Sequence, residues 1–173
     1  MINNIIRGLI YFIVFLFIQI AVLNNIHFLR IATPFLYLYI ILKMPVGMSR
    51  SLILLLAFFI GLTMDVFSNT AGMHASACTF AALCRAPLIN FLIGKDQVEG
   101  SYPSFNTFGY SSFFRYVLFF VLLHHITLFL VESLSFYDPL FMVLRISASV
   151  VLTSLLIFIV ESFNIVVREI GGK

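Results

Sequence analysis

The sequence has little charge. Only 10% of its 173 residues are Asp, Glu, Lys or Arg, and 62% are hydrophobic, with a mean hydropathy of +1.12. Soluble domains carry about 25% charged residues. A core of this size cannot enclose so many apolar side chains, 21 Phe among them, so lipid must solvate much of the surface. The composition predicts an all-α integral membrane protein, and the net charge of +3 is then a sign of membrane topology, with no nucleic-acid partner.

Cysteines and catalytic motifs are also scarce. Cys78 and Cys84 lie six residues apart in one apolar segment, a spacing from which no disulfide or metal pattern can be built. There is no GxSxG or HExxH motif. "GLTMD" (61–65) and "YD" (137–138) stand in the reverse order to the two aspartates of intramembrane aspartyl proteases, and the second glycine is missing. We therefore expect a protein that is not an enzyme and has no cofactor or metal.

Apolar runs are abundant, and a helix needs about 20 such residues to cross about 30 Å of hydrocarbon. They predict a six-transmembrane-helix bundle in a single polytopic domain over residues 1–173. The predicted spans are about 6–23, 32–45, 50–66, 72–92, 112–133 and 140–167. The first imitates a signal peptide but lacks a small-residue cleavage site, so we expect it to be retained. The fourth is interrupted by Arg85 and Pro87, where we expect a kink.

The basic residues predict the orientation. With a cytoplasmic N-terminus, the outer side holds only Arg30 and Arg145. The inner side holds Arg7, Lys43, Arg50, Lys95, Arg115, Arg168 and Lys173. This asymmetry follows the positive-inside rule and predicts that both termini are cytoplasmic. The polar stretch 94–112 is then a cytoplasmic loop, either flexible or a contact surface.

Asp65 is a lone carboxylate near the outer end of the third predicted span. A charge at the centre of a spanning helix costs about 2.5–3.5 kcal/mol on insertion scales, and less near the interface. Asp65 could reach the free backbone N–H groups at the start of the next helix. Ser68, Asn69 and Thr70 are N-cap candidates for that helix. We interpret Asp65 as the anchor of a tight hairpin, with contact to a ligand or partner as the alternative.

Further ionisable residues lie in the fifth predicted span, in "HHITLFLVE". His124, His125 and Glu132 can share a face about two turns long. Adjacent histidines diverge by about 100° and lack the i, i+4 spacing of a metal pair. We expect pairing inside the bundle, with Glu132 facing Arg145, and keep partner or ligand contact as the alternative. Arg85 is expected to reach the headgroups or to pair with a carboxylate.

Small side chains repeat every four residues in three of the predicted spans. They are Ala57 and Gly61, then Ala71, Ala75 and Thr79, then Ser149 and Thr153. Small residues let helices approach closely in lipid, where hydrophobicity alone does not drive helices together. This pattern predicts that spans 50–66, 72–92 and 140–167 are central. The first and fifth spans, rich in large side chains, are predicted to face lipid or another protein.

The order of these segments resembles a known family. "PFLYLYIILKMP" precedes "FFIGLTMDVFSNTAGMHASACTFAAL", and "RAPLINFLIGKDQVEG", "FFRYVLFFVLLHHITLFLVESLSF" and "RISASVVLTSLLIF" follow. Over nearly the whole chain, they resemble the Bacteroidetes-type MreD family of rod shape-determining proteins. In that family a Gly–Asp-bearing span runs through a short Gly-containing turn into a small-residue helix. Gly61, Asp65 and Gly72 match this pattern, and His74, just after the turn, is a further candidate.

The resemblance implies a non-enzymatic scaffold of the bacterial inner membrane that supports cell shape. Its partners would be the bitopic protein MreC and, through the complex, MreB and the glycan polymerase–transpeptidase pair of sidewall peptidoglycan synthesis, besides membrane lipid. The implied fold is similar to the six-helix substrate-binding subunits of energy-coupling-factor transporters. A vitamin-binding subunit is therefore the alternative. Two features weigh against it: the first span has only Ala21 where those subunits carry an alanine-rich face, and the outer loops offer few hydrogen-bonding groups.

Overall fold

The fold is helical throughout the part of the chain that the structure describes. The computed structural model describes residues 13–23, 32–94, 99–133 and 138–171, with side chains up to Phe163, and no strand occurs in these ranges. Residues 13–21 are helical. The labelled helices are α2 (Leu38–Leu42), α3 (Arg50–Ser68), α4 (Met73–Leu92), α5 (Phe105–Phe108), α6 (Tyr110–Ser133) and α7 (Pro139–Gly171). Four of them, α3, α4, α6 and α7, are long and apolar enough to cross a membrane.

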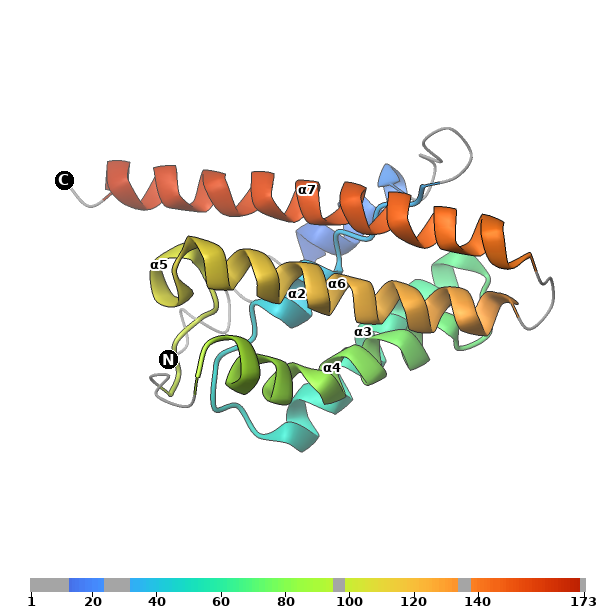
Figure 1. Ribbon diagram of the computed structural model, residues 1–173, viewed down its shortest axis with the longest axis horizontal. Helices are drawn as coiled ribbons and strands as arrows, with labels where there is room; N and C mark the ends of the chain where they lie inside the picture. Colours follow the sequence, from blue (N-terminus) through green and yellow to red (C-terminus); the bar gives the residue numbers. More distant parts are fainter. Residues whose placement is uncertain (1–12, 24–31, 95–98, 134–137, 172–173) are drawn as a thin grey trace.

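The long helices pack in the order α3, α4, α6, α7. Figure 1 shows α3 and α4 on one side of the molecule, α6 in the middle and α7 along the opposite edge. The short helix α2 lies inside this arrangement and contacts α3, α4 and α6. All of these helices share one core cluster of buried side chains, so the described chain is a single packed unit.

The last four predicted spans correspond to α3, α4, α6 and α7. The α7 helix is the longest of them, 33 residues, or about 50 Å at 1.5 Å per residue. The α4 helix continues through Arg85 and Pro87 to Leu92, so the fourth predicted span is one unbroken helix, and the kink expected at Pro87 stays a prediction. Of the first predicted span, only residues 13–23 are described, and 6–12 lie outside the described residues.

The second predicted span, 32–45, is not a continuous helix. Residues 32–37 are non-helical, and α2 after them has only five residues. The prediction took an apolar run as a lipid-facing helix, whereas Tyr37, Leu38 and Ile41 are fully enclosed by protein. Non-helical backbone at membrane depth is tolerated where protein buries it. The apolar character of this run therefore reflects packing inside the bundle.

The central long helix is α6, which corresponds to the fifth predicted span. The prediction that this span faces lipid or another protein, while α3, α4 and α7 are central, is therefore wrong for α6. In the apolar window of α6, 44% of the residues are buried, against 28% in α7. The inward face of α6 carries the fully buried aromatic side chains Phe113, Tyr116 and Phe120. Small residues mark close helix approach only, so they could not identify a helix that packs through large rings.

Candidate functional site

The α3–α4 hairpin is built around the Asp65 carboxylate, which is 3% exposed. It accepts hydrogen bonds from the backbone N–H groups of His74 and Ala75, both at 2.9 Å, and from the Thr70 hydroxyl at 2.6 Å. The two N–H groups lie in the first turn of α4, where they have no intrahelical partner. A negative charge is also favourable at a helix N-terminus. These contacts confirm the predicted reach of Asp65 to the next helix.

The turn of this hairpin differs from the prediction that Ser68, Asn69 or Thr70 caps α4. The N-cap residue is Gly72, which has no side chain, and Thr70 donates to Asp65 instead. Asn69 ends α3 in the left-handed conformation, with φ 53°, and Gly72 has φ 76°. A glycine adopts such a φ without steric cost. The cap therefore comes from the preceding helix, and the turn brings it into reach.

Gly61 lies one helical turn before Asp65 and faces the same junction. A Cβ at Gly61 would fall 2.5 Å from both the Ala75 Cα and the His74 carbonyl oxygen. The two helices thus approach too closely for any side chain at this position, as the small-residue pattern predicts. Gly61 allows the contact between α3 and α4, and Asp65 fixes its register.

His74 also belongs to a polar cluster in the centre of the bundle. The Tyr37 hydroxyl oxygen lies 2.8 Å from His74 Nδ1 and 2.9 Å from His124 Nε2. All three side chains are buried. A hydroxyl can donate one hydrogen bond and accept two, so it can bridge both imidazole rings at once. This bridge joins the segment before α2 to α4 and α6.

His125 makes separate contacts on the side facing α7. Its Nε2 lies 3.3 Å from the Thr153 hydroxyl, which also accepts from the Phe35 backbone N–H at 3.1 Å. The Phe35 ring packs against the rings of His74, His124 and His125. The two adjacent histidines thus take part in different networks. Among the described residues, no group of three or more His, Cys, Asp or Glu could hold a metal ion.

The non-helical segment before α2 obtains its hydrogen bonds from side chains. The Thr33 N–H donates to the Ser149 hydroxyl at 3.1 Å. The Gln19 amide donates to the Pro34 carbonyl at 2.9 Å and accepts from the Leu36 N–H at 2.7 Å. An unsatisfied backbone group in hydrocarbon costs several kcal/mol. These side chains therefore replace the bonds that a continuous helix would make within itself.

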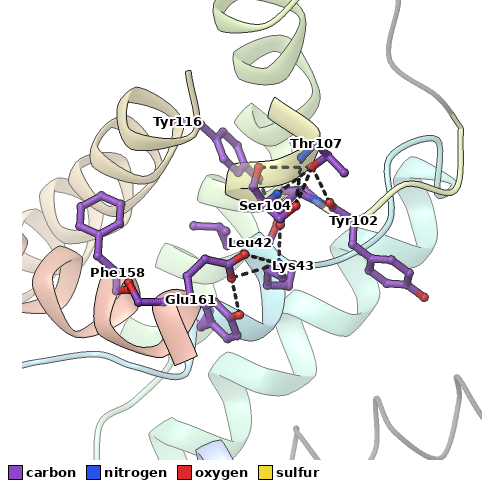
Figure 2. Close-up of polar contacts among 11 residues, drawn as sticks. Leu42, Lys43, Tyr102, Ser104, Thr107, Tyr116, Phe158 and Glu161 are labelled. Carbon is purple, nitrogen blue, oxygen red and sulfur yellow. Dashed lines mark hydrogen bonds and ion pairs between the residues drawn. The ribbon is translucent and has the colours of Figure 1, made fainter. Parts of the chain in front are cut away.

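A second buried carboxylate, Glu161 of α7, lies at the opposite end of the bundle from Asp65. It is 2% exposed and forms an ion pair with Lys43 at 3.1 Å. The Tyr39 hydroxyl donates to the same carboxylate at 2.6 Å, and Lys43 also donates to the Pro103 carbonyl. Figure 2 shows this junction, in which the Lys43 ammonium lies between α7 and the connection that precedes α6.

The polar stretch 94–112 is held at this junction by backbone pairing. The Val46 N–H donates to the Ser101 carbonyl, and the Gly100 N–H donates to the Val46 carbonyl, both at 2.8 Å. Residues 95–98 lie outside the described residues. The sequence leaves a flexible loop and a contact surface as alternatives, and the described part is packed against the bundle.

The same stretch contains the short helix α5, which a capping box begins. The Ser104 hydroxyl accepts from the Thr107 N–H, and the Thr107 hydroxyl accepts from the Ser104 N–H. Reciprocal capping satisfies two backbone donors at once. Figure 2 shows that both residues lie beside Lys43 and Tyr116, so α5 lies next to the Lys43–Glu161 ion pair.

Arg85 is buried and donates to the Met44 carbonyl. The sequence predicts that Arg85 reaches the lipid headgroups or pairs with a carboxylate. The headgroup prediction is wrong because the residue is buried. No carboxylate among the described residues forms an ion pair with it. The last carbonyls of a short helix have no intrahelical partner. Arg85 supplies a donor just beyond α2, and the Tyr116 hydroxyl donates to the Leu42 carbonyl at 3.3 Å.

Glu132 and Arg145 form the predicted ion pair, at 3.0 Å, between the C-terminal end of α6 and the N-terminal part of α7. Their side chains are 38% and 27% exposed. The Arg145 guanidinium also lies 4.6 Å from the centre of the Phe129 ring. The pair borders a cavity of ≈ 380 Å³ together with Asp138.

The predicted site residues thus gather in separate places. Gly61, Asp65, Gly72 and His74 meet at the α3–α4 hairpin, and His124 and His125 lie in the central cluster. Glu132 and Arg145 pair between α6 and α7, away from Arg85. Sequence reasoning missed Gln19, Tyr37, Lys43, Thr153 and Glu161. For Glu161 a signal was available, since it is a lone acid in the apolar run "IFIVESF", as Asp65 is in its own.

A comparison of the chain with protein-family models, curated proteins and solved structures finds no match. The resemblance to the MreD family therefore stays a prediction. The function has to be inferred from the arrangement of polar and apolar groups in the bundle.

Proposed function

We propose that the chain is a non-enzymatic scaffold of the bacterial inner membrane that binds MreC within the elongation machinery. The observation that supports this role is the use made of the buried polar groups. Asp65 holds α4, Glu161 holds the end of α2, and Tyr37 bridges two histidines. Each of these groups ties one chain segment to another, which suits a fixed frame for other proteins.

The outer surface supports the same role. Large apolar side chains remain exposed along the long helices, among them Phe59, Phe91, Leu140 and Phe163. Such a surface contacts lipid or the transmembrane helices of other proteins. In the proposed orientation, the Lys43–Glu161 end faces the cytoplasm, on the same side as Arg50 and Arg115. Both termini would then be cytoplasmic, as the positive-inside rule predicts.

The alternative role, a vitamin-binding transport subunit, requires a concave pocket with several convergent polar groups. The larger cavity, ≈ 700 Å³, is an open groove with an almost wholly apolar lining between α6 and α7. The smaller one has polar groups but lies at the partly exposed Glu132–Arg145 pair. Neither cavity favours a polar vitamin over a protein partner.

Co-expression of the full-length chain with the MreC protein of the same genome tests the proposal. We expect a tagged chain to retain MreC through mild detergent extraction. The Asp65→Ala variant should retain less MreC, because the α3–α4 hairpin loosens. The Arg115→Ala variant changes an exposed residue at the other end of the bundle and should retain as much MreC as wild type. The scaffold role would be wrong if the wild-type chain retains no MreC, or if the purified chain binds a vitamin tightly.

A further inference from the structure

The Tyr37 hydroxyl and the two imidazole rings that it bridges form a network with a limited number of hydrogens. The hydroxyl oxygen lies 2.8 Å from His74 Nδ1 and 2.9 Å from His124 Nε2. Because a hydroxyl carries a single hydrogen, it can donate to one ring only, and the other ring must donate its own N–H to the oxygen. At least one of the two nitrogens therefore has to be free of hydrogen. Protonation of both rings would leave the hydroxyl hydrogen without a nitrogen acceptor.

The second ring nitrogen of His124 makes this network sensitive to protonation. His124 is fully buried, and its Nδ1 atom has no hydrogen-bond partner among the described residues. In a neutral ring, Nδ1 can remain a bare lone pair while Nε2 carries the hydrogen that is donated to Tyr37. Protonation places a hydrogen on Nδ1, where no described residue accepts it. A buried charge that also carries an unsatisfied donor is unfavourable on both counts.

His125 is equally buried but has an acceptor for each of its nitrogens. Its Nδ1 lies 2.8 Å from the Val121 carbonyl oxygen, which can only accept, so this nitrogen already carries a hydrogen. Its Nε2 lies 3.3 Å from the Thr153 hydroxyl, whose oxygen can accept an N–H in addition to that of Phe35. The two adjacent histidines therefore form a matched pair, with the same burial but a different capacity to hold a proton.

No carboxylate among the described residues forms an ion pair with His124. The nearest acid is Asp65 of α3, whose oxygens accept from Thr70 and from two backbone N–H groups of α4. The α7 helix contributes the uncharged Thr153 to the cluster. A proton on His124 would therefore add an unpaired charge inside the bundle. The other titratable groups that face the cluster are Tyr37, His74, Cys78 and His125.

We propose that the hydrogen bond between Tyr37 and His124 is an acid-sensitive latch, which holds the segment 32–37 to α6 while His124 is neutral and opens when His124 takes up a proton. Opening releases Tyr37 at the end of this non-helical segment. The rest of the segment is then held by the side chains of Gln19, Ser149 and Thr153. This inference goes beyond the scaffold role and does not depend on MreC.

The latch makes stability depend on pH in one direction. An exposed histidine takes up a proton near pH 6.5, at about its ordinary value. The unfolded chain therefore binds a proton at position 124 that the closed latch excludes. Stability is full above about pH 6.5 and falls as the pH is lowered below this value, because the unfolded state then binds more protons. For this one histidine, the equilibrium constant for unfolding rises about tenfold between about pH 6.5 and about pH 5.5.

Denaturant titration of the full-length chain in detergent micelles tests the latch. The wild type is compared with His124→Gln and with the matched control His125→Gln, since glutamine is polar but does not titrate. The measured quantity is the ratio of the unfolding constants at the lower and the higher of these two pH values. Within each variant, this ratio cancels the cost of the substitution itself. We expect the ratio to fall about tenfold in His124→Gln and by roughly threefold at most in His125→Gln.

An unchanged ratio in His124→Gln, or equal falls in the two variants, would overturn the latch. If His124→Gln fails to fold, the wild type decides the question through nuclear magnetic resonance of its nitrogen-15-labelled histidine rings at the lower pH. We expect the His124 ring of the folded protein to give the signals of a neutral imidazole there. A protonated His124 ring in a protein that is still folded would show that the network holds the second hydrogen without opening, contrary to the proposal.

Discussion

Two buried carboxylates hold opposite ends of the bundle, and they do so by different means. Asp65 accepts from donors five, nine and ten residues later in the chain, two of which are backbone N–H groups. Glu161 accepts from the side chains of Lys43 and Tyr39, 118 and 122 residues earlier. Asp65 therefore completes a local hairpin, whereas Glu161 joins α7 to α2, which are far apart in the sequence.

The difference determines how each site can fail. Among the described residues, the Asp65 site has no cation, so its charge is stabilised by backbone dipoles, which remain when the donor residues change to any residue but proline. The Glu161 site is an ion pair of two side chains, and either can be replaced alone. Removing one partner of a buried pair leaves an uncompensated charge, which is worse than removing both. The Lys43–Glu161 junction should therefore be more sensitive to single substitutions than the Asp65 site.

Lys43→Met should have the largest effect. It leaves the Glu161 carboxylate buried with only the Tyr39 hydroxyl as a donor, and it removes the donor to the Pro103 carbonyl. Breaking a fully buried pair in this way costs about 3–5 kcal/mol, and the lower end applies here because the Lys43 side chain is 21% exposed, whereas Glu161 is 2% exposed. We expect a loss of that size in the free energy of unfolding, measured by denaturant titration of the protein in detergent micelles.

The double variant Lys43→Met/Glu161→Leu is the control for that prediction. Replacing both charges by apolar side chains of similar size is often nearly neutral. The double variant should thus recover most of the stability that Lys43→Met loses. Equal losses in the single and double variants would show that the junction depends on packing around Lys43 rather than on the buried charge.

Asp65→Ala should have the second-largest effect, a loss of about 2–3 kcal/mol in the free energy of unfolding. It leaves two backbone N–H groups of α4 buried without an acceptor. Asp65→Asn keeps one oxygen and should lose less. Hydrogen exchange at the His74 and Ala75 amides reports the loss directly, since these amides should exchange faster while the Lys43–Glu161 junction is unchanged. Thr70→Val, which removes only the hydroxyl donor, is the matched control and should leave both amides protected.

Gly61→Ala should cost about 1–3 kcal/mol by overpacking, because its Cβ meets backbone atoms that cannot move aside. The added methyl group pushes α3 and α4 apart and leaves the Asp65 carboxylate in the chain. Leu62→Ala, at the next and exposed position, is the control for altered side-chain volume. A Gly61→Ala protein as stable as wild type would mean that α3 and α4 can move apart without loss, contrary to the role assigned to Gly61.

The α3–α4 hairpin contact at Asp65 could be predicted from the sequence because its partners are local. Asp65, the turn after it and the small residues Gly61 and Ala75 lie within one short stretch, so helix-end chemistry was enough to join them. The pair of Glu132 and Arg145 is likewise separated only by the connection between consecutive helices. In each case the partners lie on neighbouring helices, and periodicity places them together.

The Lys43–Glu161 junction and the central Tyr37–histidine cluster could not be predicted in the same way. The Lys43–Glu161 and Tyr37–His124 contacts join residues 118 and 87 positions apart, and no pattern in one sequence indicates such pairs. The break of the second predicted span at residues 32–37 depends on them too. An apolar run predicts burial but does not distinguish lipid from protein as the surrounding medium. Only the hydrogen bonds from Gln19, Ser149 and Thr153 explain why a helix is not required there.

A third carboxylate, Glu132, extends the comparison because it has a cation partner like Glu161 but is partly exposed. Exposed pairs contribute about 0.2–1 kcal/mol, since solvent screens them. Glu132→Gln should therefore cost less than 1 kcal/mol in the same unfolding titration. The charge-swapped variant Glu132→Arg/Arg145→Glu should recover part of that loss, which a double-mutant cycle measures. A loss as large as that of Lys43→Met would mean that neither burial nor the long sequence separation of its partners is what makes the Glu161 junction strong.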